Sequence, residues 1–191
     1  MIRRIRFLCC ITFMICGCGG SEGGTLEYVP SVVFDIDGTL TIGTGFIDFF
    51  IARPDAARAL QIYVDKGYGV ITLTARPELV RGVTEDWLRM NGFPEVPLYM
   101  SEPFLTDDDK TEEYKLTTLR QLMEQEQRAF LYGYGDSTTD FNAYHRASIP
   151  VDHTFALLRR GDPTCQEGQY ENCLSDYTEH LTYIEEQPDV E

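Results

Sequence analysis

Two carboxylates stand two residues apart in the segment Asp35-Ile36-Asp37-Gly38-Thr39, which follows the β-branched run Ser31-Val32-Val33-Phe34. Carboxylates placed just past the end of a strand can converge within one loop. There, one can attack phosphorus while the other exchanges a proton with the leaving oxygen. Gly38 permits the backbone to turn sharply at this point. The segment therefore predicts phosphoryl-transfer chemistry centred on Asp35 and Asp37.

Other polar residues stand where apolar runs end. Thr74 closes a second β-branched run, Asp136 follows a later one, and Lys115 lies early in an amphipathic stretch. Each has an ordinary explanation when taken singly, since a strand-end Asp is often a helix cap, Thr is common in strands, and most helix lysines are solvated. Lys110 lies near Lys115 and is an alternative to it. The ordered set, rather than any one member, indicates a site.

Short apolar runs alternate with longer amphipathic stretches along the chain. We expect strands at 31–34, 69–74, 97–100, 129–132 and 148–151, and helices at 47–65, 78–91, 111–127, 138–146 and, in a less regular tail, 175–186. This alternation predicts an α/β fold with a mostly parallel sheet and helices on both faces. Ligands of such sheets bind outside the carboxyl ends of the strands, where these polar residues stand.

The chain resembles the haloacid dehalogenase superfamily in four motifs that occur in the same order: DIDGTLT, TAR, a downstream Lys and GDSTTD. The resemblance covers roughly residues 32–150 and implies a Rossmannoid three-layer sandwich with phosphatase activity. It implies that Asp35 forms an aspartyl-phosphate and that Asp37 is the general acid and base. It further implies that Thr74 hydrogen-bonds the phosphoryl group and that Lys115 neutralises the oxygens of the nucleophile and the phosphate.

The same resemblance implies Mg²⁺ as the cofactor. The implied metal set comprises Asp35, the backbone carbonyl of Ile36, Asp37, Asp136 and, in support, Asp140. The implied phosphate-binding set comprises Gly38, Thr39, Thr74, Ala75, Arg76 and Lys115. For Arg76 two interpretations stay open, namely a contact with phosphate or a surface pair with an acid such as Glu78. Coordination by oxygen without histidine is what Mg²⁺ prefers.

A narrower resemblance is to the LNS2 domain of the lipin phosphatidate phosphatases. It is carried by DIDGTLT, LTAR, KTEEYKLTTLRQL and GYGDSTTDFNAYHRASIP, and it favours Lys115 over Lys110. Asp136 departs from the Asn that is usual in the lipin motif. Some LNS2 domains lack the nucleophile and only bind lipid, so a non-catalytic binding module is an alternative; the presence of both Asp35 and Asp37 favours the catalytic branch.

The intervals 41–69 and 77–110 are too short to hold a cap domain, so we expect an open site that admits bulky phosphomonoesters. A membrane lipid such as phosphatidate is the leading substrate, and soluble nucleotides or sugar phosphates are the alternative. The net charge of −15 repels polyanions, which disfavours nucleic acid as a partner. We expect a monomer.

The N-terminus predicts export. Three arginines, a short apolar run and the segment Ile15-Cys16-Gly17-Cys18 resemble a bacterial lipoprotein signal, although an ordinary signal peptide is the alternative. The resemblance implies a signal at 1–17, lipidation of Cys18, a tether at 18–29 and a phosphatase domain at 30–191. It places the protein in the bacterial cell envelope as a lipid-anchored protein. Gly19 after Cys18 slightly favours the outer membrane as the location.

Cysteine usage agrees with export. Apart from the cysteines of the N-terminal segment, the chain has only Cys165 and Cys173, which lie in a loop-like segment. In an oxidising compartment this pair predicts a local disulfide. Metal binding by two thiols alone is the less favoured alternative.

Overall fold

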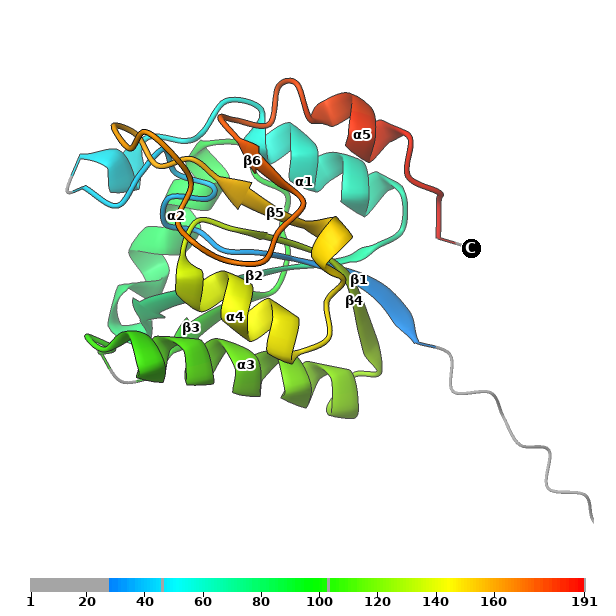
Figure 1. Ribbon diagram of the computed structural model, residues 1–191, viewed down its shortest axis with the longest axis horizontal. Helices are drawn as coiled ribbons and strands as arrows, with labels where there is room; N and C mark the ends of the chain where they lie inside the picture. Colours follow the sequence, from blue (N-terminus) through cyan, green and yellow to red (C-terminus); the bar gives the residue numbers. More distant parts are fainter. Residues whose placement is uncertain (1–27, 46, 103, 191) are drawn as a thin grey trace, which may run out of the picture.

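The apolar runs form one sheet in which every described strand pairing is parallel. In this computed structural model, which describes residues 28–45, 47–102 and 104–190, the strand order is β3-β2-β1-β4-β5-β6. The strands are β1 (Val29–Phe34), β2 (Gly69–Pro77), β3 (Leu98–Ser101), β4 (Arg128–Gly135), β5 (Thr154–Leu157) and β6 (Asn172–Leu174). Because the strands run in the same direction, their carboxyl ends meet at one edge, on the left in Figure 1. The expected α/β fold with a mostly parallel sheet is confirmed.

Helices cover both faces of this sheet (Figure 1). They are α1 (Ala56–Asp65), α2 (Arg81–Met90), α3 (Asp108–Gln125), α4 (Thr138–Arg146) and α5 (Leu181–Glu185), with single 3-10 turns η1 (Asp48–Phe50), η2 (Glu78–Val80) and η3 (Val151–His153). Successive β1 residues point to opposite faces, as strand geometry requires. Val32 and Phe34 join the core under α1, α2 and α5, whereas Val33 joins the core under α3 and α4.

The first predicted helix, 47–65, is wrong in its first half. The structure has the short turn η1 there, and α1 begins only at Ala56. Pro54 disfavours helical backbone at Arg53 before it, and Asp55 takes a left-handed conformation with φ 57°. The helix therefore begins after these residues.

The fifth predicted strand, 148–151, is also misplaced. Ser148 has a φ of 65° and Pro150 has no amide proton, so this segment joins no strand of the sheet. The strand forms a few residues later as β5, whose four residues are all buried. The polar residues that follow β5 therefore lie at the carboxyl end of a strand that the hydrophobic pattern of the sequence placed too early.

The tail adds a strand that the sequence did not predict. β6 pairs with β5, and a disulfide joins Cys165 to Cys173 with a Cα–Cα distance of 5.8 Å. The helix expected at 175–186 is reduced to α5. The disulfide of the sequence analysis is thus present, and it ties the loop after β5 to the edge strand.

The segments that could carry a cap are short. Within the described residues, the stretch from β1 to α1 contains only η1, and that from β2 to β3 contains η2 and α2, so neither forms a separate domain. Across the same described ranges, no helix has both the length and the apolar character to cross a bilayer. The predicted signal, Cys18 and most of the tether lie outside the described residues.

Candidate active site

Asp35 stands at the carboxyl end of β1, in the middle of the sheet. Its amide donates to the carbonyl of Tyr134 at 2.9 Å, which continues the pairing with β4, and its side chain is buried. The chain then turns back, because the carbonyl of Ile36 accepts the amides of Leu40 and Thr41 at 2.8 and 3.0 Å. Hydrogen bonds therefore fix the backbone on both sides of Asp35.

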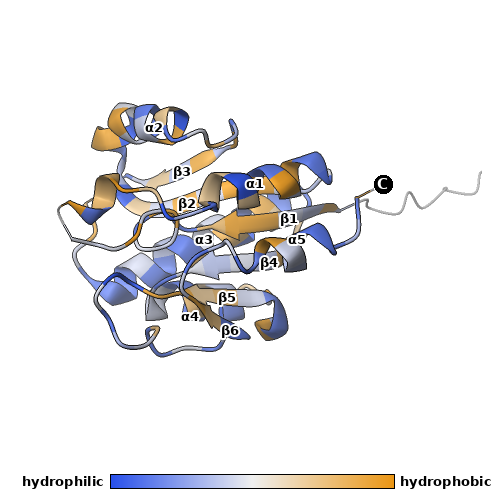
Figure 2. Cartoon of the chain, turned by 90° about the horizontal axis from the view of Figure 1, so that it is seen from above, coloured by the Kyte–Doolittle hydropathy of each residue, from blue (hydrophilic) through white to orange (hydrophobic). Residues whose placement is uncertain are grey.

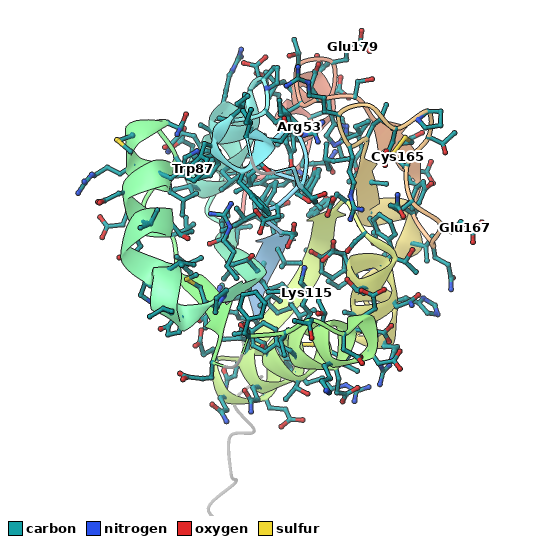
Figure 3. All side chains as sticks on the ribbon, turned by 90° about the vertical axis from the view of Figure 1, so that its left-hand side faces the viewer. Arg53, Trp87, Lys115, Cys165, Glu167 and Glu179 are labelled. Carbon is teal, nitrogen blue, oxygen red and sulfur yellow. A yellow bond between two sulfur atoms is a disulfide. The ribbon has the colours of Figure 1, made fainter. Side chains whose placement is uncertain are left out.

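Lys115 joins Asp35 to a second carboxylate. From α3, its buried Nζ donates to Asp35 Oδ1 at 2.7 Å and to Asp140 Oδ1. Figure 3 faces the carboxyl edge of the sheet and shows Lys115 between α3 and the ends of the central strands. Lys110 is exposed, and Asp107 caps the helix by accepting its amide proton at 3.2 Å. Lys115, and not Lys110, is thus the ammonium beside Asp35.

Asp136 and Asp140 complete a buried acidic cluster with Asp35. Asp136 follows β4, and Asp140 lies in the first turn of α4, where it forms a capping box with Ser137. Carboxylate oxygens of Asp35, Asp136 and Asp140 all lie within 4.8 Å of one another. The close approach requires glycine, since a Cβ at Gly38 would lie 1.9 Å from Asp136 Oδ2.

Arg159 is the second cation of this cluster. It stands two residues past β5, and its Nε donates to Asp136 Oδ2. Its side chain is 25% exposed, whereas that of Asp136 is 3% exposed. The three carboxylates of the cluster are therefore paired with two positive charges, one from α3 and one from the loop after β5.

Asp37 points to a different group. Arg76 Nε donates to both of its carboxylate oxygens at 3.0 Å, and the hydroxyl of Thr74 donates to Asp37 Oδ2 at 3.4 Å. The guanidinium of Arg76 also lies over the rings of Phe49 and Trp87, 5.5 and 5.9 Å from their centroids. Asp37 is thus held on the β2 side of the site.

Burial makes the ionised forms of the clustered carboxyls costly. It raises the pKa of Asp35 well above its usual range, against the opposing charge of Lys115. Burial and the charge of Asp140 raise the pKa of Asp136 to about 7, against the opposing effect of Arg159. Burial alone would lower the pKa of Lys115, but Asp140 and Asp35 outweigh it, and the net shift is upward. The cluster therefore holds more negative charge than its two cations relieve.

The residues present fit Mg²⁺. The cluster offers three carboxylates and only oxygen donors, close enough to share one ion. The raised pKa values of Asp35 and Asp136 indicate a place where added positive charge is stabilising. Asp35 and Asp136 would hold the ion, with Asp140 beside them.

Three of the expected site groups have hydrogen-bond partners within the protein. The Ile36 carbonyl accepts three amides in the turn, including that of Thr39 at 3.3 Å. Its role as a metal ligand stays a prediction. The carboxylate of Asp37 is bound by Arg76 and does not join the acidic cluster. The amide of Gly38 donates to the Thr41 hydroxyl at 2.8 Å, and its role in phosphate binding stays a prediction.

The remaining phosphate-set residues surround the same loop. The hydroxyl of Thr39 is buried and has no hydrogen-bond partner within the described chain. Ala75 lies between Thr74 and Arg76 at the end of β2. Arg76 pairs with an acid, but this acid is Asp37 and not Glu78, which pairs with Arg81 at 2.7 Å. A contact between Arg76 and phosphate stays a prediction.

Two arginines escaped the sequence analysis. Arg159 could have been found by the rule that found Asp136, since it follows a parallel strand, but that strand was placed too early. Arg53 donates to the carbonyls of Gly38, Thr39 and Ser175 and so braces the loop after Asp37. No pattern in the sequence singles out Arg53.

The fold and the cluster define a class. The structure is similar to the "Phospho-Aspartyl Intermediate Analogue of Phosphoserine phosphatase", with a TM-score of 0.56 and 12% identity over 83% of this chain and 100% of the other. It is also similar to a "putative had-like phosphatase" from Mesorhizobium loti, with a TM-score of 0.56 and 16% identity over 83% and 87% of the two chains. The chain thus has the fold of haloacid dehalogenase-type phosphatases.

Sequence comparison gives a narrower family. The model described as "PITM 1-3, LNS2 domain" matches residues 32–158, and the chain belongs to this family. Human "Membrane-associated phosphatidylinositol transfer protein 3" is 28% identical over 156 residues, which are 81% of this chain and 15% of that protein. The rat "Membrane-associated phosphatidylinositol transfer protein 1" is 26% identical over 182 residues, which are 93% of this chain and 13% of that protein. The chain therefore spans less than a sixth of the length of these relatives.

Proposed function

We propose that the chain is a Mg²⁺-dependent phosphomonoesterase in which Asp35 becomes phosphorylated, acting on a phosphatidate-like lipid or another bulky phosphomonoester. The observation that carries the proposal is the convergence on buried Asp35 of Lys115 at 2.7 Å and of two further carboxylates. A carboxylate and a phosphate dianion repel each other, so positive charge must separate them before they react. Lys115 supplies one such charge, and Mg²⁺ held by Asp35 and Asp136 would supply the others.

In the first half-reaction, an oxygen of Asp35 attacks phosphorus and the bond from phosphorus to the leaving oxygen breaks. Asp37 donates its proton to that oxygen, which departs as an alcohol. Arg76 and Thr74 orient Asp37 through the contacts at 3.0 and 3.4 Å. This separation of roles fits the geometry, in which Asp35 lies in the acidic cluster and Asp37 lies outside it.

In the second half-reaction, water attacks the phosphorus of the acyl phosphate. Asp37 now takes the proton of the water, phosphate leaves, and the carboxylate of Asp35 is regenerated. Lys115 stays bound to Asp35 and Asp140 and holds the attacked group in place. Catalysis of this kind is mainly positioning and charge neutralisation.

An exposed set of large apolar side chains around the site supports a lipid substrate. We call it the apolar rim; its members, with their exposed fractions, are Ile47 (71%), Phe50 (56%), Leu79 (93%), Val83 (60%) and Phe104 (74%). They lie in the segments that follow β1, β2 and β3, at the edge where Asp35 stands. Figure 2 shows hydrophobic residues on η1 and at the start of α2, both on this side of the molecule. Apolar surface in such a place is typical of contact with a membrane or another apolar partner.

The nucleophile is tested with a single substitution. Purified full-length protein should release phosphate from an aryl phosphate with Mg²⁺ and not with EDTA. Asp35→Asn should lower the rate by about 10³-fold or more, because the amide is not a nucleophile. Asp152→Asn is the matched control, since Asp152 is exposed and lies in η3, before the amino end of β5 and so at the opposite edge of the sheet from Asp35. Undiminished activity of Asp35→Asn would refute the assignment.

A second candidate function is phosphate or lipid binding without turnover. It is favoured by the family match and by the relatives, whose names describe lipid transfer and not hydrolysis. Binding of phosphatidate vesicles that Asp35→Asn leaves unchanged, with no phosphate released by the wild type, would select this function. A panel of short-chain phosphatidate, nucleotides and sugar phosphates would separate lipid from soluble substrates.

We infer that the protein is exported and anchored to a membrane through Cys18. Two features support this, namely the lipoprotein-like segment around Cys18 and the Cys165–Cys173 disulfide, which suits an oxidising compartment. In a bacterial host, metabolic labelling with a fatty-acid analogue should mark the wild type and not Cys18→Ala. Equal labelling of both would reject the anchor.

A further inference from the structure

We propose that Arg159 is an internal cation that competes with the divalent ion for Asp136. The proposal rests on the metal site of the proposed function and adds to it a residue outside the four motifs. The pairing of Arg159 Nε with Asp136 Oδ2 places a positive charge against the carboxylate that would hold the ion. Arg159 therefore weakens cation binding while it partly neutralises the charge of the cluster.

The Asp136 carboxylate has little freedom to serve both cations. Its side chain is 3% exposed, and Gly38 approaches so closely that a Cβ would lie 1.9 Å from Oδ2, the oxygen that Arg159 binds. Asp136 is therefore closely packed at the oxygen that Arg159 binds. A metal ion on Asp136 must displace the guanidinium or bind with its charge nearby.

The two cations of the cluster differ in their ability to move. Lys115 is 4% exposed in its side chain and bonds two carboxylates from within α3, so it is a fixed part of the site. Arg159 is 25% exposed and lines a cavity of about 330 Å³ together with Ile42, Leu158 and Arg160. Within the described part of the chain, its Nη groups form no hydrogen bond. Arg159 therefore has space into which it can withdraw, whereas Lys115 has none.

The charge balance predicts opposite effects on the two ligands of the site. Three carboxylates face Lys115 and Arg159, and the nearest charge to the Asp136 oxygen is that of Arg159. Removing this charge makes the site more attractive to a cation and less attractive to a phosphate dianion. A residue that served only to shape the loop would change both affinities in the same direction.

The test compares charge at position 159 in the full-length protein by titration calorimetry. Arg159→Gln keeps a hydrogen-bond donor and removes the charge, so its affinity for Mg²⁺ should rise about three- to tenfold. At saturating Mg²⁺, its affinity for inorganic phosphate should fall by about threefold or more. Arg159→Lys keeps the charge and should stay within about twofold of the wild type for Mg²⁺.

Arg160→Gln is the matched control, because it removes the same charge from the neighbouring residue. The side chain of Arg160 is 63% exposed and is paired with Asp48. Its Mg²⁺ affinity should change little, since exposed charges are screened. Equal Mg²⁺ affinities of Arg159→Gln and Arg159→Lys, or weaker binding by Arg159→Gln, would overturn the role of Arg159 alone. Failure of the wild type to bind Mg²⁺ would overturn the proposed metal site together with it.

Discussion

Gly38 packs against Asp136 with no room for a side chain between them. Its φ is 74°, a left-handed conformation that costs other residues about 1–2 kcal/mol, and a Cβ would collide with the carboxylate. The residue therefore serves the site twice, because it turns the chain after Asp37 and it lets Asp136 approach Asp35.

This predicts two separable effects of Gly38→Ala. We expect the free energy of unfolding to fall by about 1–2 kcal/mol or more from the backbone alone. We also expect the displaced Asp136 carboxylate to weaken Mg²⁺ binding. Urea unfolding and calorimetric titration with Mg²⁺ measure the two effects.

Gly92→Ala provides the control for that prediction. Gly92 follows α2 with a φ of 76°, and no described atom lies within 4 Å of a Cβ placed there. It should lose similar stability and keep its Mg²⁺ affinity. Unchanged Mg²⁺ binding by Gly38→Ala would contradict the role given to the contact with Asp136.

At this scale the sequence predicted which loops carry the chemistry better than which atoms are free. Spacing after a strand places Asp35 and Asp136 at one edge, because parallel strands end together. Spacing does not reveal that the Ile36 carbonyl accepts hydrogen bonds from amides of the turn that follows it, or that Arg76 binds Asp37. Such pairings depend on loop conformations that no local pattern encodes.

At the scale of elements, the attachment of α5 depends on a buried imidazole. His180 precedes α5, its ring lies 4.3 and 4.7 Å from the ring centroids of Phe155 and Tyr183, and its Nε2 is 3.0 Å from the hydroxyl of Tyr134. Burial lowers the pKa of His180 to about 4 from an ordinary 6.5. The neutral ring is therefore the form that packs.

This shift predicts a loss of stability in acid. Between pH 6.5 and pH 4 the unfolded state binds a proton at this position that the folded state does not. The free energy of unfolding should therefore fall as the pH drops through this window, and this contribution should level off below pH 4. Urea midpoints measured at pH 7 and pH 5 report the loss, and the loss should be smaller in His180→Gln.

The exposed His145 supplies the comparison, since His145→Gln should lose as much stability as the wild type over the same interval. An equal loss in His180→Gln and the wild type would show that other groups cause the acid sensitivity. The result concerns only the attachment of the C-terminal segment, because His180 makes no contact with the acidic cluster among the described interactions.

One misplaced element explains one missed residue. The apolar run 148–151 looked like a strand, but Ser148 takes a left-handed conformation and Pro150 lacks an amide proton, so β5 forms at Thr154–Leu157. Arg159 consequently lay too far from the predicted strand end to be considered. The first four predicted strands were located to within a few residues, because their apolar runs lie between clear helical stretches.

At the scale of the whole molecule, the apolar rim lies on one side and the described N-terminus on the other (Figure 1). The rim is held as a unit on its η1 and α2 sides, because the indole N–H of Trp87 donates to the Phe50 carbonyl at 3.0 Å. Membrane contact through the rim would present the carboxyl edge of the sheet to lipid headgroups.

If lipid is the substrate, the rim should matter for vesicles and not for soluble esters. Phe50→Ser combined with Leu79→Ser should lower the hydrolysis of phosphatidate in vesicles by about tenfold or more, since burial of two such side chains is lost. The rate with an aryl phosphate should be unchanged. Phosphate release from both substrates measures the difference.

Met90→Ser is the control for surface apolarity as such. Met90 is 75% exposed but lies at the far end of α2, away from the strand ends. Its substitution should leave both rates near those of the wild type. If the Phe50→Ser, Leu79→Ser variant hydrolyses phosphatidate in vesicles as fast as the wild type, the apolar rim does not determine the choice of substrate.

Trp87 gives the molecule a built-in optical reporter. It is the single tryptophan of the chain, it is 4% exposed, and its ring lies under the guanidinium of Arg76 while its N–H binds the backbone of η1. A ligand that draws Arg76 away from Asp37 would change the electric field at this indole. A surface that shifts η1 would change its hydrogen bond. Tryptophan fluorescence therefore follows both events from one known position, without a dye and without a second tryptophan to separate.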